Sequence, residues 1–391
     1  MNLSRQEKED WMLQAVALAE RGRGLTKPNP CVGALITIDN AVVASGWHKA
    51  YGLAHAEAEA ISEVRQKGCP LSQAVLWVTL EPCNHQGRTP PCTQAILESG
   101  IQRVMVGTRD PNTLVAGGGA EYLRSRGVEV ETGIAEQACL DLVADFIVWN
   151  REQRPFVYLK LAMTLDGKIA TRSGHSKWIS SEAARSEVHG LRSLVQAILV
   201  GGETFYADDP RLSCRTEPPL GGKQPLAVVA TSRLPDAGLK LNLLREEAKR
   251  LVILAPVREA ASEAAQSLRR AGVRVVGLDQ GPCGLDLKAG LQMLYQEYGC
   301  YYLLCEGGGR LAASLAEAGL ADELRLYIAP KILGDESARQ AFAGRRIERM
   351  DQALAWRIVD SGQAGEDVKL RLRPAATGMI DPANGAGSVL L

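Results

Sequence analysis

Apolar and polar residues alternate in short blocks along the first part of the chain. Apolar runs of strand length occur at 32–38, 41–47, 74–80, 102–107 and 128–133. Helical patterns occur at 11–19, 54–66, 90–100, 120–127 and 134–149. The pair Asp39–Asn40 predicts a turn between the first two strands. Strands that alternate with helices predict an α/β layer with a largely parallel sheet.

This pattern stops at "NREQRP" (150–155), where polar residues and a proline take over, and then begins again. Strands are predicted at 156–163, 197–201, 226–230, 251–256, 273–277, 301–306, 324–329 and 367–373. Helices are predicted at 181–194, 258–271, 286–298 and 310–319. The sequence therefore predicts two α/β domains, 1–150 and 151–375. The Gly- and Ala-rich tail, 376–391, is expected to be flexible.

The length and charge of the chain narrow the possible classes of protein. Its 391 residues exceed the about 250 to 300 residues that usually share a single hydrophobic core, so we expect two domains. The formal net charge is zero, whereas nonspecific nucleic-acid binding usually needs a basic excess. Acidic residues precede the first apolar run, unlike in a secretory signal, and no apolar stretch is long enough to cross a membrane. We expect a cytoplasmic protein without nucleic-acid or membrane partners.

The segment "HAEAEA" (55–60) places His55 and Glu57 at the start of a predicted helix. Residues two apart on a helix point about 200° away from each other, so these two side chains can share a target only off the helix end. Cys83 follows a predicted strand, and Cys92 begins the next predicted helix after two prolines. A helix N-terminus favours the thiolate, which is the form of cysteine that binds metal.

One histidine and two thiolates suit a catalytic zinc that keeps a fourth position for water. Glu57 would then take a proton from that water and hand it to a leaving group. The zinc nucleobase deaminases carry H-x-E followed by P-C-x-x-C, but here the eight residues "NHQGRTPP" separate the two cysteines. A structural zinc with His85 as fourth ligand is the alternative, and we expect Glu59 and Glu81 to be structural or solvated.

The stretches "PNPCVGA" (28–34), "HAEAEA" and "TLEPCNHQGRTPPC" (79–92) together resemble the deaminase half of the bifunctional deaminase-reductases of riboflavin biosynthesis. The resemblance implies a cytidine-deaminase-like α/β/α fold, one Zn²⁺ per chain on His55, Cys83 and Cys92, and proton transfer by Glu57. It also implies contacts with the substrate from Asn29, His48, His85 and Arg88. Arg88 stands where some family members have lysine, and its charge suits a substrate phosphate.

Two glycine-rich junctions mark the second domain. In "CEGGGRLAASLAEAGL" (305–320) a strand leads through three glycines into a helix, which lets phosphate oxygens approach backbone N–H groups. The spacing is not G-x-G-x-x-G, so a standard Rossmann site is not indicated, and a tight turn is the alternative. The segment "ILVGGETFYADDPRL" (198–212) has the same shape, and "KLAMTLDGKIA" (160–170) is a strand that ends in a turn.

With "SKWIS" (176–180), these segments resemble the reductase half of the same family, so the resemblance runs from about residue 8 to 373. It implies a dihydrofolate-reductase-like α/β fold, NADPH as cofactor and a homo-oligomer, either a dimer or a tetramer. Contacts with the cofactor are implied for Ala162, Trp178, Thr204, Asp208, Ser232, Gly308, Gly309, Arg310, Leu311, Ala312, Ala313 and Ser314. Contacts with the substrate are implied for Ser176, Arg192, Leu212, Arg215 and Glu306.

The resemblance thus implies two consecutive steps of riboflavin biosynthesis. A diaminopyrimidinone with a phosphoribosylamino group is first deaminated, and its ribosyl group is then reduced to ribityl by NADPH. Asp208 is a candidate proton donor for the second step. Two alternatives stay open: a deaminase that edits nucleic acid, which would need a basic surface, and a zinc-binding scaffold without activity.

The preference for NADPH over NADH needs a partner for the 2′-phosphate, for which an arginine near a strand end is one solution. Ser232 and Arg233 follow the strand at 226–230, and we predict this role for them, with an ordinary turn at Arg233 as the alternative. We also expect valine at Gly308 to obstruct the cofactor, and to strain the backbone if φ is positive there.

Overall fold

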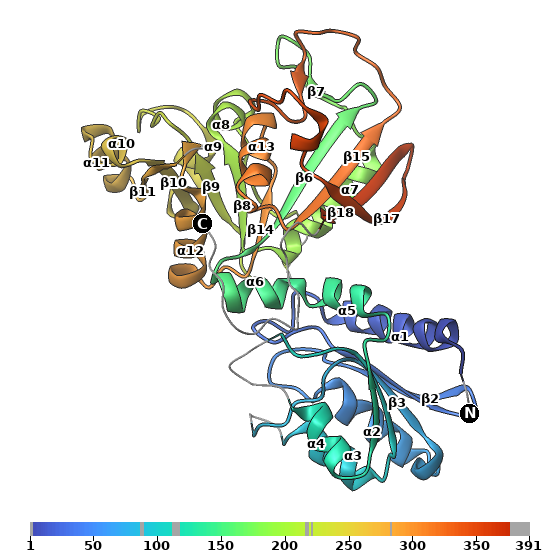
Figure 1. Cartoon of the computed structure of the whole chain (residues 1–391). Helices are drawn as coiled ribbons and strands as arrows, with labels where there is room; N and C mark the ends of the chain where they lie inside the picture. The colour runs from blue at the N-terminus through green and yellow to red at the C-terminus, as the bar shows by residue number, and fades with distance from the viewer. Residues whose placement is uncertain are drawn as a thin grey trace. The chain divides into compact units, whose positions relative to one another are not determined.

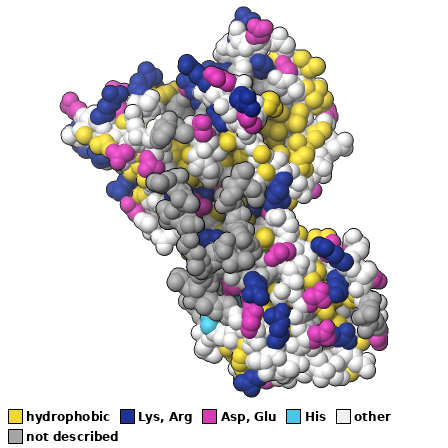
Figure 2. Space-filling model, in the orientation of Figure 1, with side chains coloured by type: hydrophobic (Ala, Val, Ile, Leu, Met, Phe, Trp, Pro, Cys, Tyr) yellow, Lys and Arg dark blue, Asp and Glu magenta, His cyan; other side chains and the backbone are white. Residues whose placement is uncertain are grey.

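The computed structural model describes residues 3–86, 90–111, 118–215, 219, 222–281 and 284–375, so the predicted tail lies outside it. The chain divides into two compact units between Glu152 and Gln153, each with its own sheet (Figure 1). No described helix is long and apolar enough to span a bilayer. Basic and acidic side chains are interspersed on the visible surface of both units (Figure 2), in keeping with the zero net charge.

The first unit contains a five-stranded sheet in the order β2-β1-β3-β4-β5. Its strands are β1 Gly33–Ile38, β2 Ala41–Trp47, β3 Val75–Leu80, β4 Arg103–Thr108 and β5 Glu129–Thr132. Its helices are α1 Arg5–Ala19, α2 Ala56–Gln66, α3 Cys92–Ser99, α4 Gly119–Ser125, α5 Glu136–Leu142 and α6 Ala144–Glu152, with 3₁₀ turns at Glu20–Gly22 and Leu71–Gln73.

The prediction of a largely parallel sheet is wrong for one half of this unit. Strand β1 is antiparallel to both β2 and β3, while β4 is parallel to β3 and β5. The two-residue turn between β1 and β2 imposes the first antiparallel pair. Asp39 and Asn40 form this turn with φ values of 49° and 60°, and hairpin turns of this kind need positive φ at both positions.

Alternation along the strands produces three layers, as predicted for an α/β/α domain (Figure 1). One face of the sheet packs on α2, α3 and α4 through Ala34, Ile36, Leu76, Val78, Val104, Val106, Ala60, Val64, Ile96 and Leu123. The other face packs on α1 and α5 through Leu35, Trp77, Met105, Met12, Ala15 and Cys139. Because successive side chains of a strand point to opposite faces, neighbours such as Leu76 and Trp77 enter different layers.

Two helices of this unit differ from their predicted extents. Helix α1 begins six residues early, because Ser4 and Glu7 form a capping box in which each side chain accepts the other's backbone N–H. The predicted helix 134–149 is instead α5 and α6, which meet at Val143. Just after this break, the buried carboxylate of Asp145 turns inward and pairs with Arg23 at 2.6 Å.

The second unit contains a nine-stranded sheet in the order β11-β10-β9-β8-β14-β6-β15-β18-β17. Its strands are β6 Phe156–Thr164, β8 Ala197–Gly201, β9 Leu226–Ala230, β10 Leu251–Pro256, β11 Arg274–Leu278, β14 Tyr302–Cys305, β15 Glu323–Ala329, β17 Trp356–Ala364 and β18 Asp367–Pro374. Strand β18 is antiparallel to β15 and β17, and the other pairs are parallel.

Helices and short strands complete this unit. The helices are α7 Glu182–Leu194, α8 Gly202–Asp208, α9 Asn242–Glu246, α10 Val257–Ala260, α11 Glu263–Arg270, α12 Leu287–Tyr298 and α13 Gly309–Glu317, with 3₁₀ turns at Ala248–Arg250 and Met350–Gln352. Two-stranded ribbons join β7 Lys168–Ala170 to β16 Arg339–Gln340, and β12 Gln280–Gly281 to β13 Gly284–Leu285.

The sequence pattern missed β17, the short ribbons and α9. Strand β17 forms the edge of the sheet and is mostly exposed, so it lacks a regular apolar face. The predicted helix 258–271 is also wrong as a single element. Ser262 begins a new helix there, because its hydroxyl accepts the N–H of Ala265 at 3.3 Å.

The parallel strands β6, β8, β9 and β14 end at one edge of this sheet, where ligands bind in open α/β sheets. Helices α8 and α13 begin there, at the two glycine-rich junctions. Gly308 has φ −68°, so the condition for backbone strain at this position, a positive φ, is not met. At Gly309 a Cβ would lie 2.2 Å from the carbonyl oxygen of Gln340, and this close packing excludes any other residue.

A buried ion pair connects the first strand of this unit to β15. Arg154, which is 0% exposed, makes two hydrogen bonds to Asp322 at 2.7 and 2.9 Å. Asp322 also accepts the N–H of Val157 at 2.7 Å. The pair therefore fixes the start of β6 against the start of β15.

We expect Asp322→Ala to destabilise the second unit by about 3 to 5 kcal/mol, because it leaves the Arg154 charge buried without this partner. Glu297→Ala is the control, since it breaks an exposed pair with Arg274 that should contribute about 0 to 1 kcal/mol. Urea unfolding of the full chain, followed by circular dichroism, measures both. Equal unfolding free energies for the two variants would contradict the role of the buried pair.

Candidate active sites

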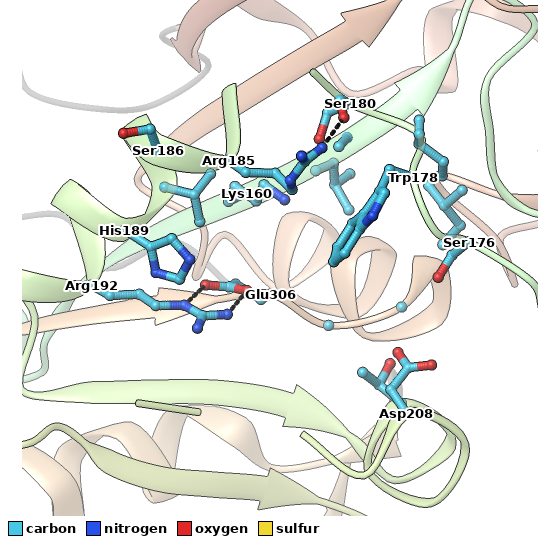
Figure 3. A pocket seen from close by; sticks show the side chains of 18 of the residues that line it. Lys160, Ser176, Trp178, Ser180, Arg185, Ser186, His189, Arg192, Asp208 and Glu306 are labelled. Carbon is cyan, nitrogen blue, oxygen red and sulfur yellow. Dashed lines mark hydrogen bonds and ion pairs between the residues drawn. The ribbon is translucent and has the colours of Figure 1, made fainter. Parts of the chain in front are cut away.

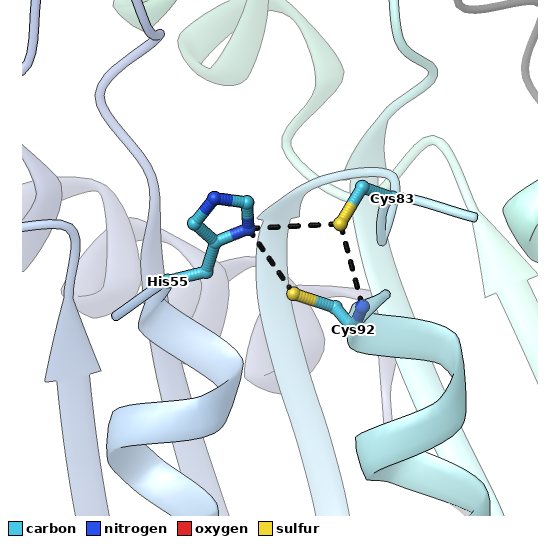
Figure 4. A group of neighbouring side chains, drawn as sticks. All are labelled: His55, Cys83 and Cys92. Carbon is cyan, nitrogen blue, oxygen red and sulfur yellow. Dashed lines mark hydrogen bonds between the residues drawn. The ribbon is translucent and has the colours of Figure 1, made fainter. Parts of the chain in front are cut away.

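Three metal-binding side chains converge in the first unit (Figure 4). His55 is the N-cap of α2, Cys83 follows the end of β3, and Cys92 is the first residue of α3. Nδ1 of His55 lies 3.3 Å from Sγ of Cys92 and 3.6 Å from Sγ of Cys83. The three ligand atoms lie within 4.8 Å of one another, and no other group of this kind occurs among the described residues.

The two thiols are held in an environment that favours a bound cation. The backbone N–H of Cys92, at the start of α3, points to Sγ of Cys83 at 3.3 Å. The Cys92 thiol and then His55 lower the pKa of Cys83 to about 4 by hydrogen bonding, whereas the same thiol–thiol bond raises the pKa of Cys92. One thiol of the pair therefore loses its proton more readily, and a bound dication would favour the loss of both thiol protons. This ligand set fits zinc with an open fourth position.

Glu57 lies in the first turn of α2 and is 3% exposed. Its carboxylate is next to the Cys92 thiol, so His55 and Glu57 meet off the helix end as the H-A-E spacing predicts. Burial, and then the negative charge of Cys83, raises the pKa of Glu57. A carboxyl group with a raised pKa can take up and return a proton near neutral pH.

Asn29 and His48 lie beside this group. The amide nitrogen of Asn29 is 3.2 Å from Nε2 of His48, and Nδ1 of His48 is 3.1 Å from the carbonyl oxygen of Ala54. Because the amide nitrogen can only donate, the proton of neutral His48 belongs on Nδ1. The ring of His48 is 5.3 Å from that of His55, and His48 is 2% exposed, so it is enclosed beside the metal-binding group.

The other predicted residues of this unit are placed differently. His85 is exposed and does not belong to the metal-binding group, so the described residues do not form the closed four-ligand site of the alternative hypothesis. Arg88 lies outside the described residues. Glu81 accepts the N–H groups of Asp110 and Ala120, and Glu59 pairs with Lys49, so both are structural as expected.

In the second unit, a cleft of about 630 Å³ opens where the parallel strands end (Figure 3). The predicted residues that line it are Ala162, Ser176, Trp178, Arg192, Thr204, Asp208, Arg215, Glu306 and Gly308. They come from β6, the segment before α7, α7, α8, the loop after α8, and the junction of β14 with α13. The fold therefore brings together most of the candidate substrate and cofactor residues of this unit.

A partly buried ion pair lines this cleft. Arg192 donates two hydrogen bonds to Glu306, both of 2.7 Å, and a third to the carbonyl oxygen of Ser213 at 3.1 Å. The side chains of Arg192 and Glu306 are 17% and 14% exposed. Burial raises the pKa of Glu306, but the hydrogen bonds and charge of Arg192 outweigh it, and the net pKa is lowered. Glu306 is therefore a carboxylate at neutral pH.

A second cleft, of about 590 Å³, continues from the first, because Thr204 and Gly308 line both. Its lining includes the predicted residues Ser232, Arg310, Leu311 and Ser314, and also Arg233. The guanidinium of Arg233 lies 5.3 Å from the ring of Tyr206, whose hydroxyl donates to the carbonyl oxygen of Arg233 at 2.8 Å. Two clefts joined at a glycine–helix junction suit an elongated ligand with a phosphate near its middle.

Comparison with known proteins agrees with both sites. Residues 5–108 match the cytidine and deoxycytidylate deaminase zinc-binding region, and residues 155–370 match the RibD C-terminal domain. The riboflavin biosynthesis protein RibD of Actinobacillus pleuropneumoniae is 40% identical over 361 residues, which is 92% of this chain and 94% of that protein. The Escherichia coli K12 protein of the same name is 34% identical, with 94% and 99% covered.

The chain belongs to the RibD family.

Solved RibD structures have the same two-domain fold. Acinetobacter baumannii RibD has a TM-score of 0.72 and 36% identity, covering 95% of this chain and 100% of that one. A Thermotoga maritima deaminase/reductase has a TM-score of 0.74 and 34% identity, covering 95% and 99%. The predicted fold and function are confirmed at this level: a cytidine-deaminase-like domain and a RibD reductase domain, which together perform the deaminase and reductase steps of riboflavin biosynthesis.

Four residues of the second unit, for which the resemblance implied contacts with cofactor or substrate, line neither cleft. Gly309, Ala312 and Ala313 are buried within α13. Leu212 is also buried and has φ 45°. Its carbonyl oxygen accepts a hydrogen bond of 2.8 Å from Arg250, so it belongs to the packed support of the loop that carries Arg215.

The sequence analysis missed four charged or ionisable residues that line the first cleft: Lys160, Glu182, Arg185 and His189. Lys160 interrupts the apolar run of β6, which was the available signal. Arg185 and His189 precede Arg192 on α7 by seven and three positions. Such spacing puts all three on one face of the helix, but the sequence does not show which face meets the cleft.

We expect the stability lost in Arg192→Gln to be larger at about pH 7 than at about pH 4. The pKa of Glu306 in the folded state is lowered, so the stability from its ionised form is present above its ordinary value of about 4.3 and is lost as pH falls through the lowered value. Without Arg192, burial would raise this pKa, so the carboxylate would cost stability mainly at neutral pH.

Urea unfolding of the full chain at several pH values measures this difference. The matched control is Arg274→Gln, which breaks an exposed pair with Glu297 and should cost little at any pH. A loss of stability in Arg192→Gln that does not change with pH would contradict the assignment.

Proposed function

We propose that the deaminase domain, 1–150, binds one Zn²⁺ through His55, Cys83 and Cys92 and uses Glu57 to move protons during deamination. The observation that carries this proposal is the convergence of one imidazole and two thiols beside a buried carboxyl group. When bound, zinc supplies a Lewis acid that activates water. Glu57 accepts a proton from the attacking water and returns it to the departing amine.

The substrate of this step is proposed from the relatives. The Thermotoga maritima enzyme is named a diaminohydroxyphosphoribosylaminopyrimidine deaminase, and we propose the same pyrimidine for this chain. Asn29 and His48, which are hydrogen-bonded to each other next to the metal-binding group, would contact the pyrimidine ring. His85 and Arg88 are proposed to contact the ribose phosphate, and Arg88 offers it a positive charge.

We propose that the reductase domain, 151–375, binds NADPH across its two clefts. The nicotinamide end would lie near Ala162 and Trp178, and the phosphates near Thr204 and the start of α13, where backbone N–H groups are available. Ser232 and Arg233 are proposed to hold the 2′-phosphate, and Arg310, Leu311 and Ser314 line the same cleft. NADPH supplies the hydride for reduction of the ribosyl side chain.

The substrate of the reductase step is proposed to contact Ser176, Arg192, Arg215 and Glu306, which line the first cleft. The Thermotoga maritima enzyme is named a 5-amino-6-(5-phosphoribosylamino)uracil reductase, and we propose the same substrate here. Arg192 and Arg215 suit its sugar phosphate, and Asp208 is the candidate proton donor. A cytoplasmic homo-oligomer, dimer or tetramer, is proposed for the working enzyme.

Metal binding and deamination should separate in variants of the first site. Cys83→Ser and Cys92→Ser should each lose zinc and deamination, because each removes a metal ligand. Glu57→Gln should retain zinc and lose deamination by about a hundredfold or more, because it removes only the proton carrier. Zinc per chain and release of ammonia are measured on the same preparations.

The reductase activity of Glu57→Gln shows whether this variant is folded. Glu57→Gln should oxidise NADPH at the wild-type rate when it receives the already deaminated substrate, because the two sites are built in different units. Deamination by Glu57→Gln at a near-native rate would refute the role of Glu57. Loss of both activities in this variant, with its fold intact, would instead argue for one shared site.

Arg233→Ala should weaken NADPH binding about tenfold or more and change NADH binding little, because it removes one charge-assisted hydrogen bond to the 2′-phosphate. Dissociation constants of both cofactors, measured by fluorescence titration, test this prediction. Arg211→Ala is the matched control, since Arg211 is exposed, pairs with Glu246 and does not line the cleft. Equal weakening of both cofactors, or of neither, would exclude Arg233 from 2′-phosphate recognition.

A further inference from the structure

Helix α7 presents a histidine to the reductase cleft that the proposed function does not use. His189 lies on the helix face that also carries Arg185 and Arg192, and all three line the cleft. The imidazole of His189 lies beside the Arg192–Glu306 ion pair (Figure 3). It is therefore next to the residues proposed to bind the substrate.

The two ring nitrogens of His189 have different surroundings. Nδ1 is buried and has no hydrogen-bond partner among the described residues. No described residue is hydrogen-bonded to Nε2. It is not among the described buried atoms that lack a partner, so it is accessible. Because His189 lines the cleft, Nε2 is the nitrogen that a ligand in the cleft can reach.

The charged neighbours of His189 favour a neutral ring with its proton on Nε2. Those that act on its pKa are Arg192 on α7, Arg215 in the loop after α8, Lys160 on β6 and Glu306 after the end of β14. Burial, followed by the charges of Arg192 and Arg215, lowers the pKa of His189. Nearby cations stabilise a lone pair on the enclosed Nδ1, whereas a proton on Nε2 can be donated to water or a ligand. The ring therefore offers the cleft one neutral N–H donor.

The same neighbours define the charge of the ligand that fits here. Of the four charged groups that act on the pKa of His189, three are basic and one is a carboxylate, and Arg185 lies on the same face of α7, so this end of the cleft is positive while the ring is neutral. A phosphate monoester carries about −1.5 to −2 charges at neutral pH and has three strong acceptor oxygens. The basic side chains balance that charge, and a neutral donor can orient one oxygen without adding charge.

We propose that His189 is a substrate-binding residue of the reductase site, whose Nε2–H donates a hydrogen bond to a phosphate oxygen of the sugar-phosphate substrate. The proposal rests on the proposed function, which places the substrate phosphate at Arg192 and Arg215. It adds a directional contact that discriminates phosphorylated from unphosphorylated ribosyl substrates.

Two substitutions separate the two ring nitrogens. The amide nitrogen of glutamine in His189→Gln takes the place of Nε2, and that of asparagine in His189→Asn takes the place of Nδ1. We expect His189→Asn to raise KM for the deaminated phosphorylated substrate about tenfold, the usual effect of losing one hydrogen bond to a charged acceptor. His189→Gln should stay within about threefold of wild type, and KM for NADPH should not change in either variant. Equal KM values for both variants would overturn the assignment to Nε2–H.

Inorganic phosphate, used as a competitive inhibitor of the reductase step, tests whether the group that accepts the hydrogen bond of His189 is a phosphate. Its inhibition constant should rise about tenfold in His189→Asn and more than tenfold in Arg215→Ala. A rise in Arg215→Ala alone would overturn the proposal for His189 and leave the proposed phosphate site intact. No rise in either variant would overturn the phosphate site itself.

The pH profile provides a second test that does not depend on His189→Asn being folded. A neutral His189 predicts that kcat/KM has the same shape from about pH 6 to about pH 9 in wild type and His189→Gln. If wild-type kcat/KM falls as pH rises through a pKa in this range, and the fall is missing in His189→Gln, His189 acts as a cation and the proposal is overturned.

Discussion

Both sites depend on the same structural feature, a junction at which a parallel strand ends and a helix begins. Strand β3 ends just before Cys83, and α3 begins at Cys92, so a backbone N–H at the helix start stabilises a thiolate at the strand end. Strand β14 ends just before Glu306, and α13 begins at Gly309. Because parallel strands end at one edge of a sheet, residues far apart in sequence meet there. The remaining structure holds these junctions in place, for example through Glu81, whose carboxylate accepts two backbone N–H groups of neighbouring segments.

The two sites use this geometry for opposite electrostatic purposes. The deaminase site gathers two thiols and a carboxyl group, a set that is stable only when a cation or shared protons neutralise it. Around His189, the reductase cleft gathers Lys160, Arg192 and Arg215 near the carboxylate of Glu306, and so favours an anionic ligand there. The zero net charge of the chain conceals both clusters. Net charge predicts nonspecific binding to polyanions, but it does not predict the charge of a cleft that a few side chains line.

The sequence predicts the deaminase site well because its signals are local. His55, Cys83 and Cys92 each lie at an element boundary that glycine, proline or apolar periodicity marks, and the fold brings the three boundaries together. The reductase cleft is less predictable, since the rotation of α7 that points His189 inward depends on packing against distant strands. The antiparallel β1–β3 pair and the edge strand β17 were missed for a related reason. Strand direction and pairing partners are set by long-range contacts, whereas periodicity reports only on burial of one face.

The three glycines at the start of α13 show how one motif combines separate requirements. At Gly307 a Cβ would lie 2.6 Å from a side-chain atom of Leu311, and at Gly309 it would lie 2.2 Å from a backbone oxygen of Gln340. At Gly308 the nearest atom would be Oγ1 of Thr204, at an ordinary 3.5 Å, and φ is not positive. Packing therefore demands glycine at 309, where the neighbour is backbone and cannot move aside, whereas neither packing nor backbone conformation demands it at 308. Gly308 lies where the two clefts meet, and glycine there leaves space for the proposed NADPH to approach the helix N-terminus.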